Sequence, residues 1–199
     1  MMMRDVRDNV LLPKMEEIRE DLEAKAKDFA DISMLAHTHG QPASPTTVGK
    51  EMVVFAERLQ DGITNLGSVA IKGKLNGATG NYNALTFAYP EVDWPAVSRQ
   101  FVESQGFEFN RATTQIEPHD WMARYFQELA LNNTIMTDID QDIWAYIMLK
   151  YFSLKVNEDE TGSSTMPHKV NPIDYEKSEG NLGSANAVLY HLAETLPIS

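Results

Sequence analysis

A segment of small hydroxyl residues, followed by a lysine and an asparagine, lies at 162–172 with the sequence GSSTMPHKVNP. A free serine is a weak base, but its alkoxide can accept a proton if a cation, backbone amides and exclusion of water stabilise it. Lys169 is the obvious cation here. The pattern favours a loop that closes over an anion, so we expect residues 157–166 to be mobile without ligand. The alternative is a flexible linker between helices.

A second candidate is His39, which lies in the sequence THGQP at 38–42, directly before a long apolar-periodic stretch. Histidine titrates near neutral pH, so His39 could act as a general acid or base. On position alone, a loop histidine that hydrogen-bonds the backbone is the simpler interpretation. His37 raises the idea of a metal pair, but no third ligand follows at short spacing and the chain has no cysteine. We therefore expect no metal site.

Two further polar segments carry glycines, at 73–84 (GKLNGATGNYNA) and 112–120 (ATTQIEPHD). The amides and side chains of the first could bind carboxylate or phosphate oxygens. The second offers hydrogen-bonding groups, including Gln115, before a long helix. Glycine and asparagine are also ordinary turn residues, and threonine before a helix is usually a cap, so each segment alone is a weak signal. We expect His119 to belong to the helix start.

These segments separate stretches with helical periodicity. Apolar residues recur at three- and four-residue spacing over 6–29, 46–72 and 120–151, with Pro13 as a possible kink in the first. A shorter helix is predicted from Asp93, a good N-cap, to a stop at Gly106, and a fifth from Pro172 onward. No stretch shows sustained alternation of apolar and polar residues, so we expect no sheet of consequence. The predicted fold class is all-α.

The length of these helices constrains their packing. Helices of 27 to 32 residues would extend about 40 to 48 Å, as long as a compact chain of this size is wide, so they must lie side by side in an elongated bundle. A bundle of four or five helices uses one inner face of each. Extra apolar residues such as Trp144, Met148 and Phe152 therefore indicate contact with another subunit, and we expect a homo-oligomer that assembles through the bundle.

Composition excludes several classes of protein. The chain has 199 residues, 17 basic and 29 acidic side chains, and a formal net charge of -12, which argues against a nucleic-acid binder. No apolar run approaches the roughly 18 residues needed to span a bilayer, so we expect no membrane association. Hydrophobic residues make up 43% of the sequence, enough for a core. We expect a cytoplasmic protein.

The segment at 162–172 resembles the signature of the fumarase/aspartase superfamily, GSSxMPxKxNP, with every fixed position filled. Members of this superfamily eliminate fumarate from substituted succinates. The histidine-lysine-valine variant of the signature is followed by IDYEKSEGNLG, and the chain also contains THGQPASPTTVGKE, GKLNGATGNYNA, YPEVDW and TTQIEPHD in matching order. This combination is similar to the bacterial branch that cleaves a succinylated purine nucleotide. The alternatives are a branch that acts on another succinate derivative, such as argininosuccinate, malate or aspartate, or an inactive oligomerising helical scaffold.

The resemblance implies catalytic roles for three residues. Ser163 would be the base that removes a proton from the β-carbon of the succinyl group. His39 would be the general acid that protonates the leaving nitrogen, because an anionic amine is a poor leaving group. Glu176 would be the carboxylate partner of His39.

The resemblance also implies residues that bind a succinyl-nucleotide substrate. Lys169 and Asn171 would bind a substrate carboxylate and stabilise the carbanion-like intermediate. Gln115 would bind the succinyl or nucleotide part, Thr38 would help hold the phosphate or carboxylate end, and Ser164 would contribute to substrate binding. No cofactor is expected.

In the superfamily, three helical domains form a subunit and four central domains form the core of a tetramer. Residues 1–199 would correspond to the central domain, with the segments before and after it absent from this chain. Each active site combines segments of three subunits, so His39 and Ser163 of one site would come from different chains.

Overall fold

A computed structural model describes residues 2–155, 166 and 170–198 of the chain. Its helices are α1 (Met2–Val6), the π-helical turn η1 (Arg7–Leu11), α2 (Leu12–Asp28), α3 (Val48–Ser68), α4 (Asn83–Ala88), α5 (Trp94–Ser104), α6 (Asp120–Met148) and α7 (Ile173–Thr195). Its strands are β1 (Ser33–Thr38), β2 (Gln41–Thr47), β3 (Lys72–Gly73) and β4 (Glu108–Phe109). The all-α prediction is confirmed, because the strands form two small two-stranded sheets.

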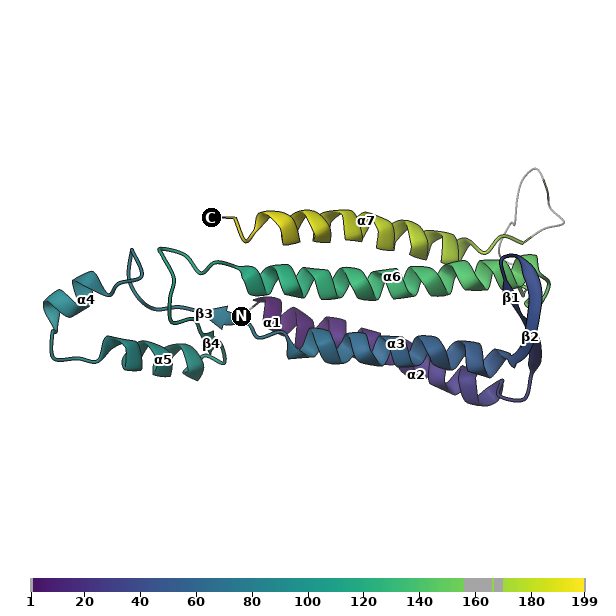
Figure 1. The fold of residues 1–199 in the computed structure, drawn as a ribbon, viewed down its shortest axis with the longest axis horizontal. Coiled ribbons are helices and arrows are strands. Elements are labelled where there is room, and N and C mark those ends of the chain that lie inside the picture. The colour runs from purple at the N-terminus through teal and green to yellow at the C-terminus, as the bar shows by residue number, and fades with distance from the viewer. Residues whose placement is uncertain (1, 156–165, 167–169, 199) are drawn as a thin grey trace.

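The long helices α2, α3, α6 and α7 lie lengthwise beside one another in an elongated bundle (Figure 1). The β1–β2 hairpin lies at one end, beside the end of α6 and the start of α7. The short helices α4 and α5, with β3 and β4, extend beyond the other end. Among the described residues, no helix is both long and apolar enough to cross a membrane.

The core runs along α3, which packs against α2 on one side and α6 on the other. Leu59 and Leu66 of α3 are fully buried. One apolar cluster comprises Leu22, Met52, Phe55, Ala56, Leu59 and Ile135, and a second comprises Met15, Leu66 and Tyr125. Helix α7 packs against α6, and in the described part of the chain it buries only Ala193. It therefore presents most of its surface outward.

Helix boundaries follow local chemistry. The side chain of Thr47 accepts a hydrogen bond from Lys50 N at the start of α3, and Asp93 accepts one from Ala96 N at the start of α5, as its sequence predicted. Helix α5 ends at Ser104, and Gly106 follows with φ +77°. Pro13 has no amide hydrogen, and the turn before it is π-helical, with Leu12 N–H bonded to Arg7 O.

The residues around His39, at 37–45, form regular structure where the sequence indicated a loop. They belong to an antiparallel hairpin whose register pairs Met34 with Thr46 and Thr38 with Gln41, with a bulge between Leu35 and His37. Two prolines in β2, Pro42 and Pro45, hide this strand from sequence patterns, because proline cannot donate to a β-ladder. The hairpin tolerates these prolines because both strands of a two-stranded sheet are edge strands.

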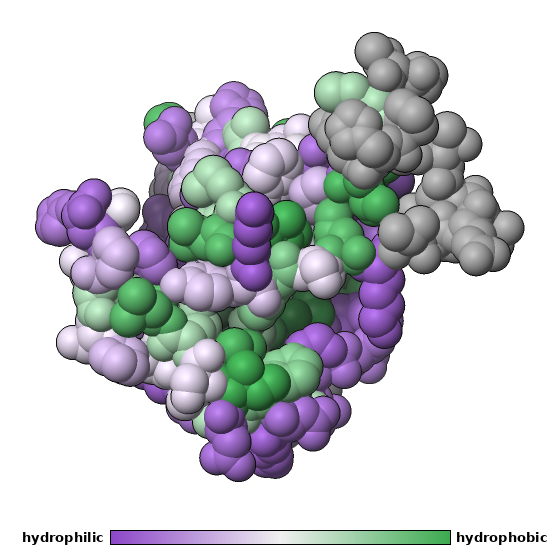
Figure 2. Space-filling view, turned by 90° about the vertical axis from the view of Figure 1, so that its right-hand side faces the viewer, coloured by the Kyte–Doolittle hydropathy of each residue, from purple (hydrophilic) through white to green (hydrophobic). Residues whose placement is uncertain are grey.

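The expectation of an outward-facing apolar surface holds for two of the three residues named. Trp144 and Met148 are exposed, by 43% and 75%. Phe152 instead packs inward against the first apolar cluster and meets the ring of Tyr146 edge-on, with 5.3 Å between ring centroids. Its outward assignment was wrong because the chain turns back after α6 ends. Figure 2 views the bundle onto its hairpin end and shows apolar residues exposed among hydrophilic ones there.

Replacement of Gly49 by alanine should destabilise the bundle. A Cβ at Gly49 would lie 2.3 Å from Ala26 O and 2.7 Å from Ala30 Cα, so α2 and α3 would have to separate. We expect Gly49→Ala to lower the free energy of unfolding by about 2 kcal/mol, measured by chemical denaturation. The matched control is Gly67→Ala near the end of α3, where a Cβ would meet only Leu12 Cδ1 at 3.7 Å. Equal stability of both variants would contradict the close packing of α2 on α3.

Candidate active site

His39 occupies the tip of the β1–β2 hairpin. His39 and Gly40 form its two-residue turn with φ values of +52° and +70°, and Thr38 pairs with Gln41 across it. Positive φ at both central positions defines the type I′ turn, which matches the twist of a hairpin. Few residues other than glycine adopt this left-handed conformation, although histidine does so more often than most, and non-glycine residues in it cluster at functional sites. The geometry presents an exposed imidazole at the end of the bundle.

Two more of the residues named from sequence lie at this end. Asn171 precedes α7, and its carbonyl accepts a hydrogen bond from Ile173 N. Glu176 lies in the first turn of α7 and is exposed. Within the described part of the chain, no hydrogen bond or ion pair joins His39 to Glu176. Ser163, Ser164, Lys169 and the segment 157–165 predicted to be mobile lie outside the described residues.

Gln115 lies at the opposite end of the bundle, just before α6 begins (Figure 1). Helix α6 has 29 residues, so it spans about 43 Å at 1.5 Å per residue. The hairpin lies near the far end of the same helix, where Tyr151 Oη donates to Leu35 O. The fold of one chain therefore brings His39, Thr38, Asn171 and Glu176 to one end and leaves Gln115 at the other.

The backbone that carries Gln115 is fixed by Lys74. The Lys74 ammonium donates to three carbonyl oxygens, Gly77 O at 3.1 Å, Thr114 O at 2.9 Å and Gln115 O at 2.5 Å. Three donors meet three acceptors, so the hydrogen-bonding capacity of this ammonium is fully used. Lys74 therefore holds the loop in place and is not free to bind a substrate anion.

A buried amide joins the same two loops. Asn76 is fully buried, and its side chain exchanges hydrogen bonds with the hydroxyl of Thr113, at 2.8 and 3.1 Å. Gly80 lies so close to Thr113 that a Cβ would be 1.9 Å from Thr113 O. Asn76 and Gly80 of the 73–84 segment thus position the 112–120 segment, and the structure assigns these two residues a packing role.

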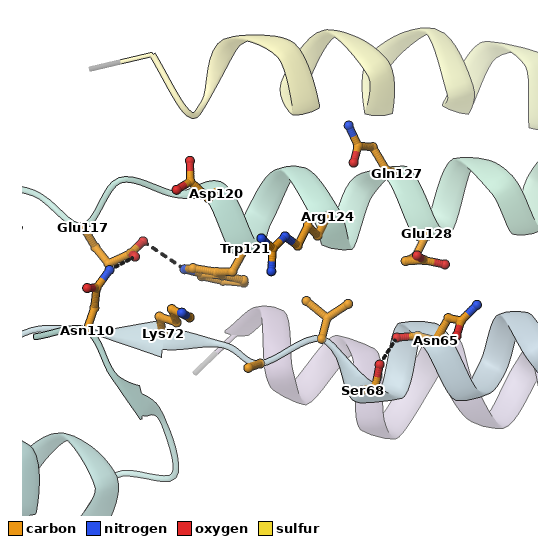
Figure 3. Close-up of a pocket in the computed structure, with 12 residues that line it drawn as sticks. Asn65, Ser68, Lys72, Asn110, Glu117, Asp120, Trp121, Arg124, Gln127 and Glu128 are labelled. Carbon is orange, nitrogen blue, oxygen red and sulfur yellow. Dashed lines mark hydrogen bonds between the residues drawn. The ribbon is translucent and has the colours of Figure 1, made fainter.

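Glu117 is a residue of this end that the sequence patterns did not single out. Its carboxylate accepts hydrogen bonds from Asn110 Nδ2 at 2.8 Å and from Trp121 Nε1 at 3.0 Å (Figure 3). It accepts a third from His119 N at 2.8 Å. These bonds hold the sharp turn at His119, whose φ is +67°, immediately before α6. A glutamate three residues before the first residue of a helix was the available signal.

A polar cavity of about 360 Å³ adjoins this turn between α3 and α6. Both cationic and anionic side chains line it, including Lys72, Arg124, Glu117 and Glu128 (Figure 3). Lys72 forms an ion pair with Glu108 at 3.0 Å. The cavity contains none of the site residues named from sequence. Among the described residues, no group of three or more His, Asp or Glu side chains could hold a metal ion.

The half of α6 that approaches the hairpin is acidic and partly buried. Burial raises the pKa of Asp142, and the nearby carboxylates Asp138 and Glu51 raise it further. Burial also raises the pKa of Asp140, while a hydrogen bond from Ser178 of α7 opposes that change.

Comparison with known sequences extends over the whole chain. A sequence family described as lyase matches residues 1–188. Proteins named adenylosuccinate lyase are similar: that of Escherichia coli (strain K12) is 52% identical over 199 residues, which are 100% of this chain and 44% of the relative. That of Vibrio cholerae is 51% identical over 100% of this chain and 44% of the relative. That of Legionella pneumophila (strain Corby) is 52% identical over 94% of this chain and 41% of the relative.

The chain thus spans less than half the length of the curated relatives it matches. The family match covers nearly all of the chain and includes the segment whose sequence resembles the fumarase/aspartase signature. The chain therefore belongs to this lyase family.

Proposed function

We propose that the intact protein eliminates fumarate from adenylosuccinate to give AMP, and from the related succinyl-aminoimidazole-carboxamide ribotide, in purine biosynthesis. The observation that carries this proposal is the similarity of the whole chain to proteins named adenylosuccinate lyase, about half of whose aligned residues are identical. The complete signature at 162–172, which lies within the aligned residues, agrees with a fumarate-releasing lyase. A cytoplasmic location fits such an enzyme, and residues 1–199 would form its central domain.

The chemical difficulty of this reaction lies in the β-carbon proton, which is only weakly acidic beside a carboxylate. We assign its removal to Ser163. The electron pair left on carbon forms the double bond of fumarate as the C–N bond breaks. Before that, negative charge spreads onto the substrate carboxylate, where Lys169, Asn171 and Ser164 would stabilise it in a site closed to water.

The leaving nitrogen requires a proton, which we assign to His39. An exposed imidazole at the tip of a hairpin can reach into the site of a neighbouring subunit. In this role His39 needs a carboxylate that holds its tautomer and stabilises its charged form. Within one chain it has no bond to Glu176, so we propose that this contact forms across a subunit interface. Thr38, beside His39, would hold an anionic end of the substrate.

The position of Gln115 supports a site shared between subunits. About 43 Å of α6 separates it from the hairpin, far more than one small nucleotide can bridge. A second copy packed antiparallel would bring its Gln115 end beside the His39 end of the first. Exposed apolar residues on α6 and α7 offer surface for this contact; they are Leu131, Trp144, Met148, Val188 and Tyr190. We propose a homotetramer with shared active sites.

A substrate screen tests the activity. The intact protein should release fumarate from adenylosuccinate, followed by absorbance, and not from argininosuccinate, malate or aspartate. Ser163→Ala and His39→Ala should each reduce kcat by about 10²- to 10⁴-fold, the usual contribution of general acid–base catalysis. Release from one of the other substrates alone would assign the chain to another branch. Full activity of Ser163→Ala would exclude its role as the base.

Complementation between variants tests the shared site. His39→Ala and Gln115→Ala should each be impaired, but co-expression should restore up to about a quarter of wild-type activity, because random assembly gives some sites both intact residues. The matched control is His39→Ala with Thr38→Ala. These residues lie on the same hairpin, so mixing cannot create an intact site. Recovery no greater than in this control would contradict the shared arrangement.

A further inference from the structure

The β1–β2 hairpin that carries His39 is bonded to the end of α6 at its bulge. Tyr151 Oη donates to Leu35 O at 3.1 Å, and His37 Nδ1 lies 3.1 Å from the same oxygen. A carbonyl oxygen has two lone pairs and can accept both bonds. The rings of His37 and Tyr151 also lie against each other, with 5.9 Å between centroids. The bulge between Leu35 and His37, just before the turn at His39, is thus held by Tyr151, a residue outside the hairpin.

Tyr151 itself is held in place by the end of α6. Its amide donates to Tyr146 O at 2.9 Å, and the amide of Lys150 donates to Ile147 O at 3.1 Å. With Lys150 at φ +64°, this is the Schellman arrangement that closes a helix. Lysine takes the left-handed position where glycine is usual. The phenol of Tyr151 therefore extends from a defined helix end rather than from a loose loop.

A second bond fixes the other strand. The Glu51 carboxylate accepts from the hydroxyl of Thr46 on β2 at 3.1 Å and from Tyr146 Oη at 3.2 Å. Burial, and then the charges of Asp142 and Glu51, raise the pKa of Tyr146, so its phenol keeps the proton that it donates. The rings of Tyr146 and Tyr151 lie 6.4 Å apart. Each strand of the hairpin thus has one hydrogen bond that leads back to α6.

The base of the hairpin is not held by close packing against the bundle, so its position depends on these hydrogen bonds. A cavity of about 440 Å³, lined mainly by apolar atoms, lies where the hairpin joins the bundle. Ile32 and Val48, which flank the two strands, line it together with Tyr151 and Phe152. A hairpin above a cavity can tilt about its base unless directional bonds prevent it. A small tilt at the base moves the tip furthest, and His39 is at the tip.

We propose that Tyr151 is a positioning residue for His39: its hydroxyl fixes the bulge of the hairpin to the end of α6 and so sets where the imidazole stands. The inference rests on the proposed role of His39 as the general acid. Proton transfer requires the donor within hydrogen-bond reach of the leaving nitrogen, and an error of about 1 Å reduces the rate strongly. Tyr151 touches no substrate in this scheme.

Tyr151→Phe in the intact protein tests the inference, because it keeps the ring and its contacts with His37 and Tyr146 and removes one hydrogen bond. We expect kcat to fall about fivefold or more, with KM unchanged, in line with the loss of one bond. The matched control is Tyr125→Phe, which removes the phenol that donates to Met3 O at 3.4 Å from inside α6. Its kcat should match the wild type. An unchanged kcat in Tyr151→Phe would overturn the proposal.

A double variant separates positioning from general weakening of the fold. In the His39→Gln background, Tyr151→Phe should reduce kcat little further, because the residue that it positions is already gone. An equal reduction in both backgrounds would overturn the proposal. If Tyr151→Phe does not fold, Thr46→Val removes the bond to the other strand and should show the same dependence on His39.

The two hypotheses fail separately. Wild-type kcat in His39→Gln would reject His39 as the acid, whatever Tyr151→Phe does. Impairment of His39→Gln with no effect of Tyr151→Phe or Thr46→Val would leave the acid assignment intact and reject only the positioning role.

Discussion

The rigidity of one long helix determines how this chain can contribute to an active site. Helix α6 is continuous over Asp120–Met148 and is packed against both α3 and α7. A continuous helix cannot fold back on itself, so residues before its first turn and after its last remain a full helix length apart. Chemistry that requires both sets of residues must be assembled between molecules. The bundle therefore forms the core and also fixes the distance between the segments at its two ends.

The connections at the ends of the bundle share a backbone feature. In the described part of the chain, four residues other than glycine have positive φ: His39, Tyr82, His119 and Lys150. Each lies at a junction, in the hairpin turn, before α4, before α6 or after α6. A non-glycine residue keeps a positive φ only when hydrogen bonds or packing around it hold the backbone there. The carboxylate of Glu117 holds the backbone at His119, and the bonds of the Schellman turn hold it at Lys150.

Sequence periodicity predicted the bundle well, because buried faces of long helices repeat at a fixed spacing. The stretch 46–72 became α3, and Asp93 capped α5 as expected. The hairpin was missed because the prolines of β2 remove the pattern by which strands are recognised. Phe152 was misassigned because periodicity was extended past the true end of α6 at Met148.

The site was less accessible to pattern analysis than the fold. Spacing alone drew attention to His39 and the 162–172 segment, but their roles came from resemblance to a family. No sequence pattern reports that a loop is held by the ammonium of Lys74 or that a carboxylate such as Glu117 serves a turn, since these contacts depend on tertiary approach. Within the described part of the chain no hydrogen bond or ion pair joins His39 to Glu176, and their proposed pairing across a subunit interface rests on the resemblance alone.

The prolines at positions 42 and 45 have a further consequence for the outer edge of the hairpin. A two-stranded sheet leaves both outer edges unpaired, and such edges can recruit extended segments of other molecules. Proline removes amide donors from β2, so this strand is a poor template for the addition of another. The exposed tip that carries His39 can thus project from the bundle on a ribbon that resists pairing with extended strands of other molecules.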